Sequence, residues 1–459
     1  MRKIVPETFR LMLDTLRSSL WFVPATMMAA SVLLAAAATQ IASVRQAGRS
    51  LHWISTDGAR AILTTIAGSM ITVAGVVFSI TIVALSVASS QFGPRLLRGF
   101  MRDRLNQVVL GTFVSTFLYC LMVLLFVRRQ DDGSGVPQLA TALAVLLAVL
   151  GLAVLVVFIH HVSTSIQASG VIAAVVGELD QQLDRVIDQA RGGETRPPAP
   201  RLLGQGTPVE STRSDYLLGV DRESLVAWAS ERDVVVALEA RPGDFLVEGD
   251  VLLRAHHSGD PSADPPGDLS AEPPADPFDE EALDEAREAF AFGERRTAEG
   301  DPLFPIEQLV EIAVRALSTG INDPITAVAC VHRLRAALCR LASHGEAPSV
   351  HCDEDGRPRL ITRELRFADY LASALDPLRV HGARSPIVVE ALLELLESLA
   401  ARVPATEDAG LAEHLAALRA AAESDLAHER DRQRVREQAA KLKRALGGVA
   451  TGPSVAGGG

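Results

Sequence analysis

Four long apolar runs dominate the first third of the chain, whereas apolar and polar positions are interspersed over the rest. The runs cover about residues 20–41, 62–90, 107–127 and 139–163. Because a helix rises 1.5 Å per residue, about 20 apolar residues cross the roughly 30 Å hydrocarbon core of a bilayer. The pattern therefore predicts four transmembrane helices, with the lipid bilayer as a partner. The first run is too long for the core of a signal peptide, and we interpret it as a retained anchor.

The second run carries a polar stripe. No residue between Arg60 and Pro94 is charged, yet hydroxylated positions recur there at alternating steps of four and three. Such steps keep side chains on one face of a helix. The stripe consists of Thr65, Ser69, Thr72, Val76, Ser79, Val83, Ser86 and Ser90.

The stripe has two interpretations. In a homo-oligomer, one such helix per subunit would surround a pore whose Ser and Thr oxygens stabilise a partly hydrated ion. The pore-lining candidates are Thr65, Ser69, Thr72, Ser79, Val83, Ser86 and Ser90. Alternatively, small polar residues serve helix packing, and their hydroxyls bond to carbonyls of their own helix.

Charge divides the chain at about residue 163. Residues 1–163 carry 13 Lys/Arg and 6 Asp/Glu, and the remainder carries 31 and 50. An acidic body lacks the cations that neutralise nucleic-acid phosphates, so we expect no nucleic-acid partner. Eight basic residues precede the first run or lie between the second and third, against five in the other two loops. Since basic loops favour the inner side, the pattern predicts a multi-pass protein with both termini cytoplasmic.

Beyond the spans, the pattern predicts a mostly α protein with one small β unit. Pro-, Gly- and Asp-rich tracts separate the segments. The predicted segments are a four-span transmembrane domain at 1–163, a helical stalk at 164–190, a linker at 191–213, a small β unit at 214–257, a disordered acidic linker at 258–280, a helical cytoplasmic domain at 281–446 and a disordered tail at 447–459.

The β unit is predicted from short strand-like runs separated by turn signals. Pro242-Gly243-Asp244 and Gly249-Asp250 separate DVVVALEA, FLVEG and DVLLRA, and Leu225–Ser230 is expected to form a short helix. This pattern resembles the half-barrel of biotinyl- and lipoyl-type domains, which implies a barrel-like unit. No lysine stands at a hairpin tip, so we expect no prosthetic group and no other cofactor.

The helical domain contains a polar cluster of residues. Helices are expected near 361–380, 386–402 and 410–446, and Asp323 with Pro324 has the pattern of a helix start. The ligand-binding candidates are Arg295, Arg296, Arg315, Asn322 and Asp323, together with Thr297, Asp301, Ser318 and Thr326. They would gather around an anionic ligand, or they would serve as caps and salt bridges.

Several runs together resemble one known family. They are SMITVAGVVFSITIVALSVASSQFGPRLLRGFMRDRLNQVVLGTFVSTFLYC, FIHHVSTSIQ and RALSTGINDPITA. They are similar to a bacterial family of predicted membrane proteins, domain of unknown function 2254. The resemblance implies a bacterial inner membrane and a four-span N-terminal half, but it implies no substrate and no catalytic residue.

Catalytic motifs are missing from the sequence. It contains no P-loop, no H-E-x-x-H and no G-x-G-x-x-G between a strand and a helix, so we expect no enzyme. His160 and His161 have no neighbouring ligands in the sequence, so no metal site is expected. The sequence favours an oligomeric ion channel with a cytoplasmic regulatory domain. A membrane-anchored sensor or scaffold without conduction is the alternative.

Overall fold

A computed structural model describes the chain in two compact units, Met1–Val171 (unit 1) and Ile172–Gly459 (unit 2). The described residues are 21–45, 54–92, 104–129, 138–165, 167–191, 202, 206–257, 278–344, 348–403 and 408–448. Most residues of the two predicted linkers lie outside the described residues, as do residues 449–459 of the predicted tail at 447–459.

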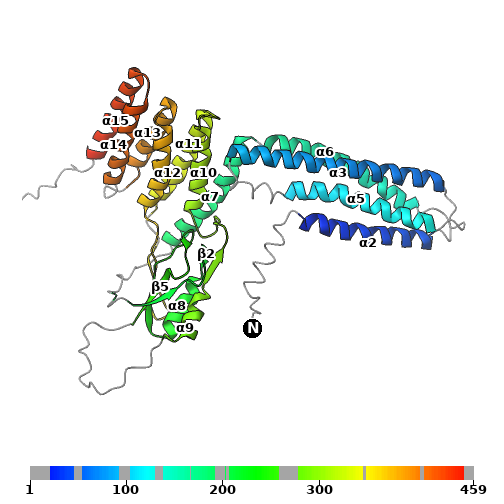
Figure 1. The fold of residues 1–459 in the computed structure, drawn as a ribbon, viewed down its shortest axis with the longest axis horizontal. Coiled ribbons are helices and arrows are strands. Elements are labelled where there is room, and N and C mark those ends of the chain that lie inside the picture. Colours follow the sequence, from blue (N-terminus) through cyan, green and yellow to red (C-terminus); the bar gives the residue numbers. More distant parts are fainter. Residues whose placement is uncertain are drawn as a thin grey trace, which may run out of the picture. The chain divides into compact units, whose positions relative to one another are not determined.

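Within its described residues, unit 1 contains four long apolar helices, which are candidate membrane spans at the four predicted places. They are α2 (Phe22–Arg45), α3 (Thr56–Phe92), α5 (Arg104–Arg129) and α6 (Gln138–Ser165), drawn in blue to cyan-green in Figure 1. Each has a stretch long and apolar enough to cross a bilayer.

The core of unit 1 is built around α5, which packs against α2, α3 and α6. Gly111 lets α5 approach α2 closely, since a Cβ there would lie 3.3 Å from the Cα of Pro24. Tyr119 is fully buried, and its hydroxyl donates a hydrogen bond of 3.0 Å to the carbonyl of Ala140. Close contacts and a satisfied polar group suit helix packing in lipid.

An amphipathic helix, α7 (Ala168–Arg191), begins three residues after α6 ends and continues into unit 2. Its buried apolar side chains recur at helical spacing. On another face, Arg340 pairs with Asp180 at 2.7 Å and with Asp184 at 2.5 Å. The apolar face and these ion pairs hold α7 within unit 2.

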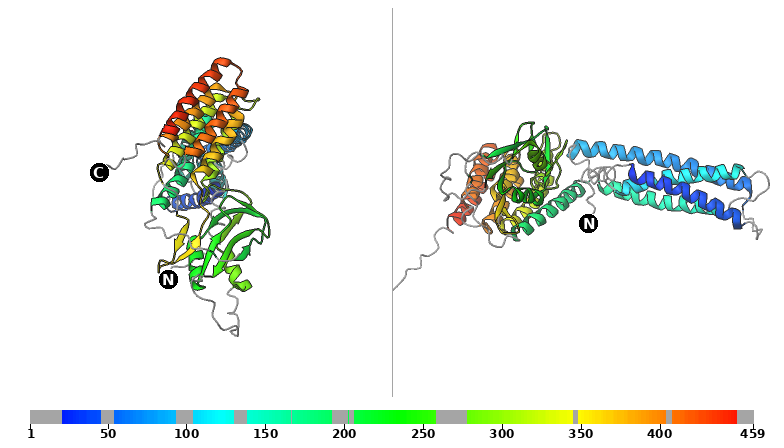
Figure 2. Two further views of the ribbon diagram at one scale, coloured as in Figure 1. Left: turned by 90° about the vertical axis from the view of Figure 1, so that its left-hand side faces the viewer. Right: turned by 90° about the horizontal axis from the view of Figure 1, so that it is seen from below.

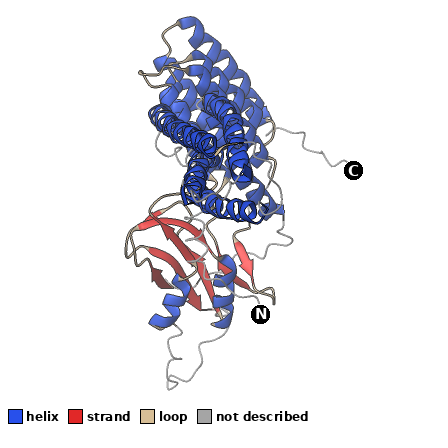
Figure 3. Cartoon of the chain, turned by 90° about the vertical axis from the view of Figure 1, so that its right-hand side faces the viewer, coloured by secondary structure: helices blue, strands red, loops and turns tan. Residues whose placement is uncertain are grey.

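The described residues of unit 2 form two open sheets, one of five strands in the order β1-β5-β3-β8-β7 and one of three in the order β4-β2-β6. Figure 3 shows the strands in red. The strands are β1 (Thr207–Glu210), β2 (Asp215–Val220), β3 (Val234–Leu238), β4 (Phe245–Leu246), β5 (Val251–His257), β6 (Phe290–Gly293), β7 (Val350–Cys352) and β8 (Pro358–Ile361).

The predicted barrel-like unit is therefore wrong. β3 pairs in parallel with β8, and β2 pairs with β6, so strands from outside 214–257 occupy edges that a small closed barrel would have joined. Two helices, α8 (Arg222–Glu231) and α9 (Glu280–Arg287), accompany the sheets. Trp228 of α8 is buried, and its indole N–H donates to the carbonyl of Ala282 at 3.1 Å.

Among the described residues of unit 2, six further helices lie side by side (Figure 2). They are α10 (Leu303–Ala316), α11 (Pro324–Ala342), α12 (Phe367–Gly382), α13 (Pro386–Ala400), α14 (Asp408–Asp425) and α15 (Glu429–Gly448). The expected helix start at Asp323 is confirmed, because its carboxylate accepts from the N–H of Thr326 at 3.1 Å.

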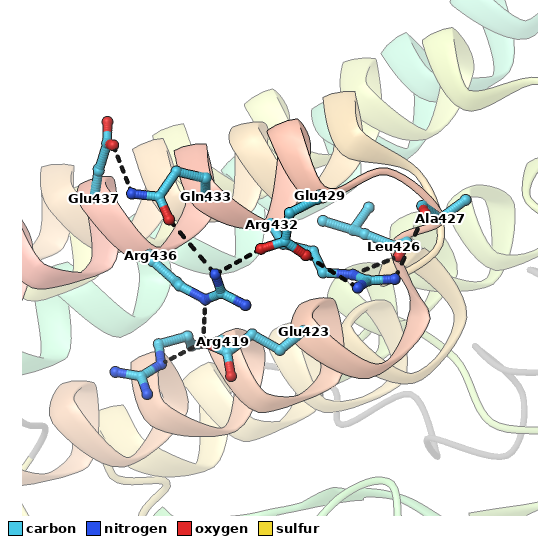
Figure 4. Close-up of polar contacts among 9 residues, drawn as sticks. All are labelled: Arg419, Glu423, Leu426, Ala427, Glu429, Arg432, Gln433, Arg436 and Glu437. Carbon is cyan, nitrogen blue, oxygen red and sulfur yellow. Dashed lines mark hydrogen bonds and ion pairs between the residues drawn. The ribbon is translucent and has the colours of Figure 1, made fainter.

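The single helix predicted at 410–446 is instead a hairpin of α14 and α15. The connection contains neither Gly nor Pro, so the sequence gives no strong break. Arg432 closes it by donating to the carbonyl of Leu426 at 2.8 Å, and Arg436 lies 3.3 Å from Glu423 and 2.8 Å from Glu429 (Figure 4). These contacts join the two helices at the turn.

Candidate functional site

The face of α3 that bears the stripe lies opposite the face that packs in the bundle. The packed face is at most 7% exposed and contains Leu63, Ala67, Ala74, Val77 and Ala84. The exposed face contains Thr65, Ser69, Thr72, Ser79, Val83 and Ser86, whereas the side chain of Ser90 lies outside the described residues. The predicted stripe therefore faces away from the packed helices of unit 1.

The first three hydroxyls of the stripe donate hydrogen bonds to carbonyls of α3 itself. Thr65, Ser69 and Thr72 donate to the carbonyls of Ala61, Thr65 and Gly68 at 2.7, 2.8 and 2.8 Å. Each donor is therefore satisfied without a second helix, while lone pairs of each oxygen point outward. This arrangement suits a helix interface and also a wet surface.

Two glycines, Gly68 and Gly75, leave open space beside the stripe of α3. A Cβ added at Gly68 or Gly75 would meet no atom within 4 Å. By contrast, the outward side chains of α6 are large and apolar, as Val149 and Leu152 illustrate at 60% and 62% exposure. Large aliphatic side chains are suited to lipid, whereas small residues let helices approach closely.

The ligand-binding candidates are distributed over both ends of α10. Arg296 lies before its N-terminus, whereas Arg315 lies near its C-terminus and pairs with Glu311 at 3.3 Å. A helix of 14 residues is about 20 Å long. Asn322 and Asp323 belong to the second end, because the N–H of Asp323 donates to the carbonyl of Ala316 at 2.7 Å. Hydrogen bonds from Thr326 lower the pKa of Asp323.

Arg296 forms the centre of a half-buried ionic cluster. Its Nε lies 2.5 Å from Oδ2 of Asp301 and its Nη1 lies 2.6 Å from Oε2 of Glu307. Asp301 is only 2% exposed and accepts from the N–H of Leu303 at 3.1 Å, at the start of α10. Burial raises the pKa of Asp301, and the bond to Arg296 opposes that rise. Arg295 is exposed beside this cluster.

The turn between β3 and β4 covers the ionic cluster. Gly243 has a φ of +98°, and a Cβ there would collide with the carboxylate of Asp301. Asp244 fixes the turn by accepting from the N–H of Arg241 at 2.9 Å. The sequence indicated this turn but not the partner beneath it.

A cleft of about 510 Å³ opens beside the cluster and the turn. It lies wholly within unit 2, and its walls come from α7, the β2–α8 connection, the β3–β4 turn, the segment before α10 and the segment before α12. Of the ligand-binding candidates, Arg296 and Asp301 line it, and the others do not. Sequence reasoning missed Arg185, Arg363 and Tyr370, because no local spacing relates these segments.

Metal ligands do not gather within the described part of the chain. No three His, Cys, Asp or Glu side chains lie close enough there to hold a metal ion. The four cysteines are unpaired thiols, of which Cys120 and Cys330 are buried.

The described part of the chain has the architecture of a membrane protein, with four helices long and apolar enough to cross a bilayer, followed by two sheets and a helical array. The chain belongs to the DUF2254 family of predicted membrane proteins, whose sequence profile matches residues 17–398. The described helices α14 and α15 lie beyond the matched residues.

Mycobacterial proteins are similar over most of the chain. Uncharacterized proteins of Mycobacterium tuberculosis (strain CDC 1551 / Oshkosh) and Mycobacterium bovis (strain ATCC BAA-935 / AF2122/97) are each 33% identical over 393 residues. The aligned part covers 83% of this chain and 72% of each relative. No solved structure matches the chain significantly.

Proposed function

We propose that the protein is a homo-oligomeric channel of the bacterial inner membrane, in which the outward stripe of α3 lines the conducting path. Unit 2 then acts as its cytoplasmic regulatory part. The proposal assigns no catalytic reaction and no cofactor to the chain. The observation that carries it is the exposure of the whole described stripe opposite the packed face of α3.

The chemistry of the stripe supports conduction over simple lipid contact. Outward oxygens of Thr65, Ser69 and Thr72 would offer acceptors to a partly hydrated cation. The small residues Gly68 and Gly75 would let copies of α3 approach one another at an oligomer axis. No Asp, Glu, Lys or Arg lies between Arg60 and Pro94, which favours passive conduction over ion-coupled transport.

A constriction is expected at Val83. Its side chain is 59% exposed and lies on the stripe between Ser79 and Ser86. Apolar constrictions gate pores by dewetting. Val83 would therefore form the narrow apolar ring of the path, with hydroxyls on either side.

The second candidate is a membrane-anchored sensor or scaffold whose α3 helices pack into a sealed interface. The bonds of the hydroxyls to their own carbonyls favour it, because such a stripe needs no water. Both candidates place the stripe between subunits. They differ in whether water reaches it.

Cysteine labelling separates the two candidates. Single cysteines would replace Thr72, Ser79 and Ser86 on the stripe, and Ile71 and Ile80 on its flanks. The background would carry Cys120→Ala, because Cys120 lies in the span α5, and Cys339→Ser and Cys352→Ser, because these two thiols are partly exposed. Cys330 lies outside the spans, is fully buried and would be kept. Ile71 and Ile80 are 44% and 39% exposed in the single subunit and serve as lipid-facing controls.

A channel predicts that the stripe cysteines react with a small water-soluble thiol reagent and that the flanking cysteines do not. A sealed interface predicts that none reacts and that oxidation links stripe cysteines between subunits. Equal reaction at stripe and flank would contradict both arrangements.

A further inference from the structure

We infer that the cleft in unit 2 binds a small organic phosphate, whose phosphate group is held by Arg185, Arg241 and Arg363. Three separate elements supply these residues: α7, the β3–β4 turn and the segment before α12. This inference does not depend on conduction through α3, since all the residues concerned belong to unit 2.

The size of the cleft suits a metabolite. Its volume of about 510 Å³ lies within the roughly 300–1,000 Å³ of small-molecule sites. Apolar side chains form part of the wall, among them Leu218, Val220, Leu238 and Leu365. They would contact the organic part of the ligand, while charged side chains would hold its anionic group.

Part of the charge in the cleft is internally paired. Arg296 is bound by Asp301 and Glu307. Nη2 of Arg222 lies 2.8 Å from Oε1 of Glu364, although the angles are not those of a hydrogen bond. These cations are committed to carboxylates and are not the residues that would hold a ligand.

Three guanidinium groups remain available. Within the described part of the chain, no ion pair involves Arg185, Arg241 or Arg363, yet all three line the same cleft. Four acids that line the cleft have no ion pair in the described part of the chain. Glu223 and Glu299 are exposed, whereas Asp221 accepts from the N–H of Ser224 and Asp244 accepts from the N–H of Arg241. Arginine forms paired hydrogen bonds to phosphate oxygens, and three arginines on separate elements match the several oxygens of a phosphate group.

The buried wall of the cleft adds a neutral donor. Tyr370 of α12 is 4% exposed and lines the cleft. Burial raises the pKa of its hydroxyl, as do the nearby charges of Glu364, Asp301 and Asp369, while Arg241 opposes the rise. The phenol therefore stays protonated at neutral pH and is able to donate a hydrogen bond to an anion beside Arg241.

The contribution of α7 gives the site a structural consequence. Gln182, Arg185 and Gln189 of α7 line the cleft together with the β3–β4 turn. A phosphate bound by both Arg185 and Arg241 would fasten α7 to the sheets. Only two residues separate α7 from α6, the last predicted span. A ligand in the cleft would therefore contact the helix that directly follows this span.

Isothermal titration of the purified full-length protein tests the inference. The probes are three organic phosphates, each with its phosphate-free counterpart: AMP with adenosine, glucose 6-phosphate with glucose, and glycerol 3-phosphate with glycerol. At least one phosphate should bind saturably and at least tenfold more tightly than its counterpart. Arg185→Gln and Arg241→Gln should each weaken that binding about 10- to 100-fold, the loss expected for a hydrogen bond to a charged group.

Arg333→Gln is the matched control, because Arg333 is exposed on α11 and does not line the cleft. It should leave the affinity unchanged. Arg185 is itself exposed on α7, so its replacement should preserve the thermal unfolding midpoint. Absence of phosphate-dependent binding in all three pairs would overturn the inference. Binding that both cleft variants leave unchanged would overturn it as well.

Discussion

Replacing Gly243 by alanine tests how the β3–β4 turn is held on the buried Asp301–Arg296 pair. A Cβ at this position would collide with the carboxylate of Asp301 and lie 3.0 Å from Nε of Arg296. The left-handed backbone alone costs a non-glycine residue about 1–2 kcal/mol. Forcing a methyl group into a packed contact adds about 1–3 kcal/mol. We expect Gly243→Ala to lower the free energy of unfolding of unit 2 by about 2–5 kcal/mol.

Gly249→Ala provides the matched control. Gly249 has a φ of +92°, close to the +98° of Gly243, but a Cβ there would meet no atom within 4 Å. Its replacement should therefore cost only the backbone strain of about 1–2 kcal/mol. The difference between the two variants isolates the contact of the turn with Asp301.

Tryptophan fluorescence of the full chain during heating in detergent measures both variants. Trp228 is buried in the core of the sheets, and Trp21→Phe with Trp53→Phe would make it the only reporter. At about 2–4 °C per kcal/mol, the midpoint of Gly243→Ala should lie several degrees below that of Gly249→Ala. Equal midpoints would refute the packing of the turn on Asp301.

Three further predictions concern the rest of the chain. Burial and the charge of Arg222 lower the pKa of His351 in the folded state. The neutral side chain therefore stabilises the fold above pH 6.5, and this stabilisation is lost as pH falls through the folded-state pKa. Wild type should lose more thermal stability than His351→Gln between pH 7 and pH 5. Gly111→Ala should destabilise unit 1 in detergent by about 1–3 kcal/mol, because the added Cβ would lie 2.5 Å from Sδ of Met27. Gly151→Ala should not, because its nearest neighbour, Cε1 of Phe113, would lie 3.5 Å from the added Cβ. A reporter fused after Gly459 that works only in the periplasm should stay silent, and activity there would contradict the predicted topology.

Local properties of the sequence predicted the membrane helices well. Apolarity over about 20 residues is sufficient to define a span, and it needs no knowledge of distant residues. The helical period also placed Thr72, Ser79 and Ser86 on one face of α3, which the structure confirms. Helix capping at Asp323 was predictable for the same reason, since its donor lies three residues away.

Non-local pairing explains the main errors. The strands near 234–257 were visible in the sequence, but β6 and β8 join their sheets from positions far along the chain. A barrel was therefore expected where open sheets form. Likewise, Arg296 and Arg315 are close in sequence, yet a helix of 14 residues holds them apart. The cleft brings five distant segments together, and no spacing in the sequence relates them.

Recording currents across planar bilayers that contain the purified protein tests conduction through the α3 stripe most directly. We expect discrete currents from the oligomer and a larger conductance for Val83→Ser, because a hydroxyl would wet the apolar ring. Ile80→Ser also replaces an exposed aliphatic side chain by a hydroxyl, but at a flanking position, and should leave the conductance unchanged. Absence of current from folded, oligomeric protein would contradict conduction through the α3 stripe, as would equal effects of Val83→Ser and Ile80→Ser.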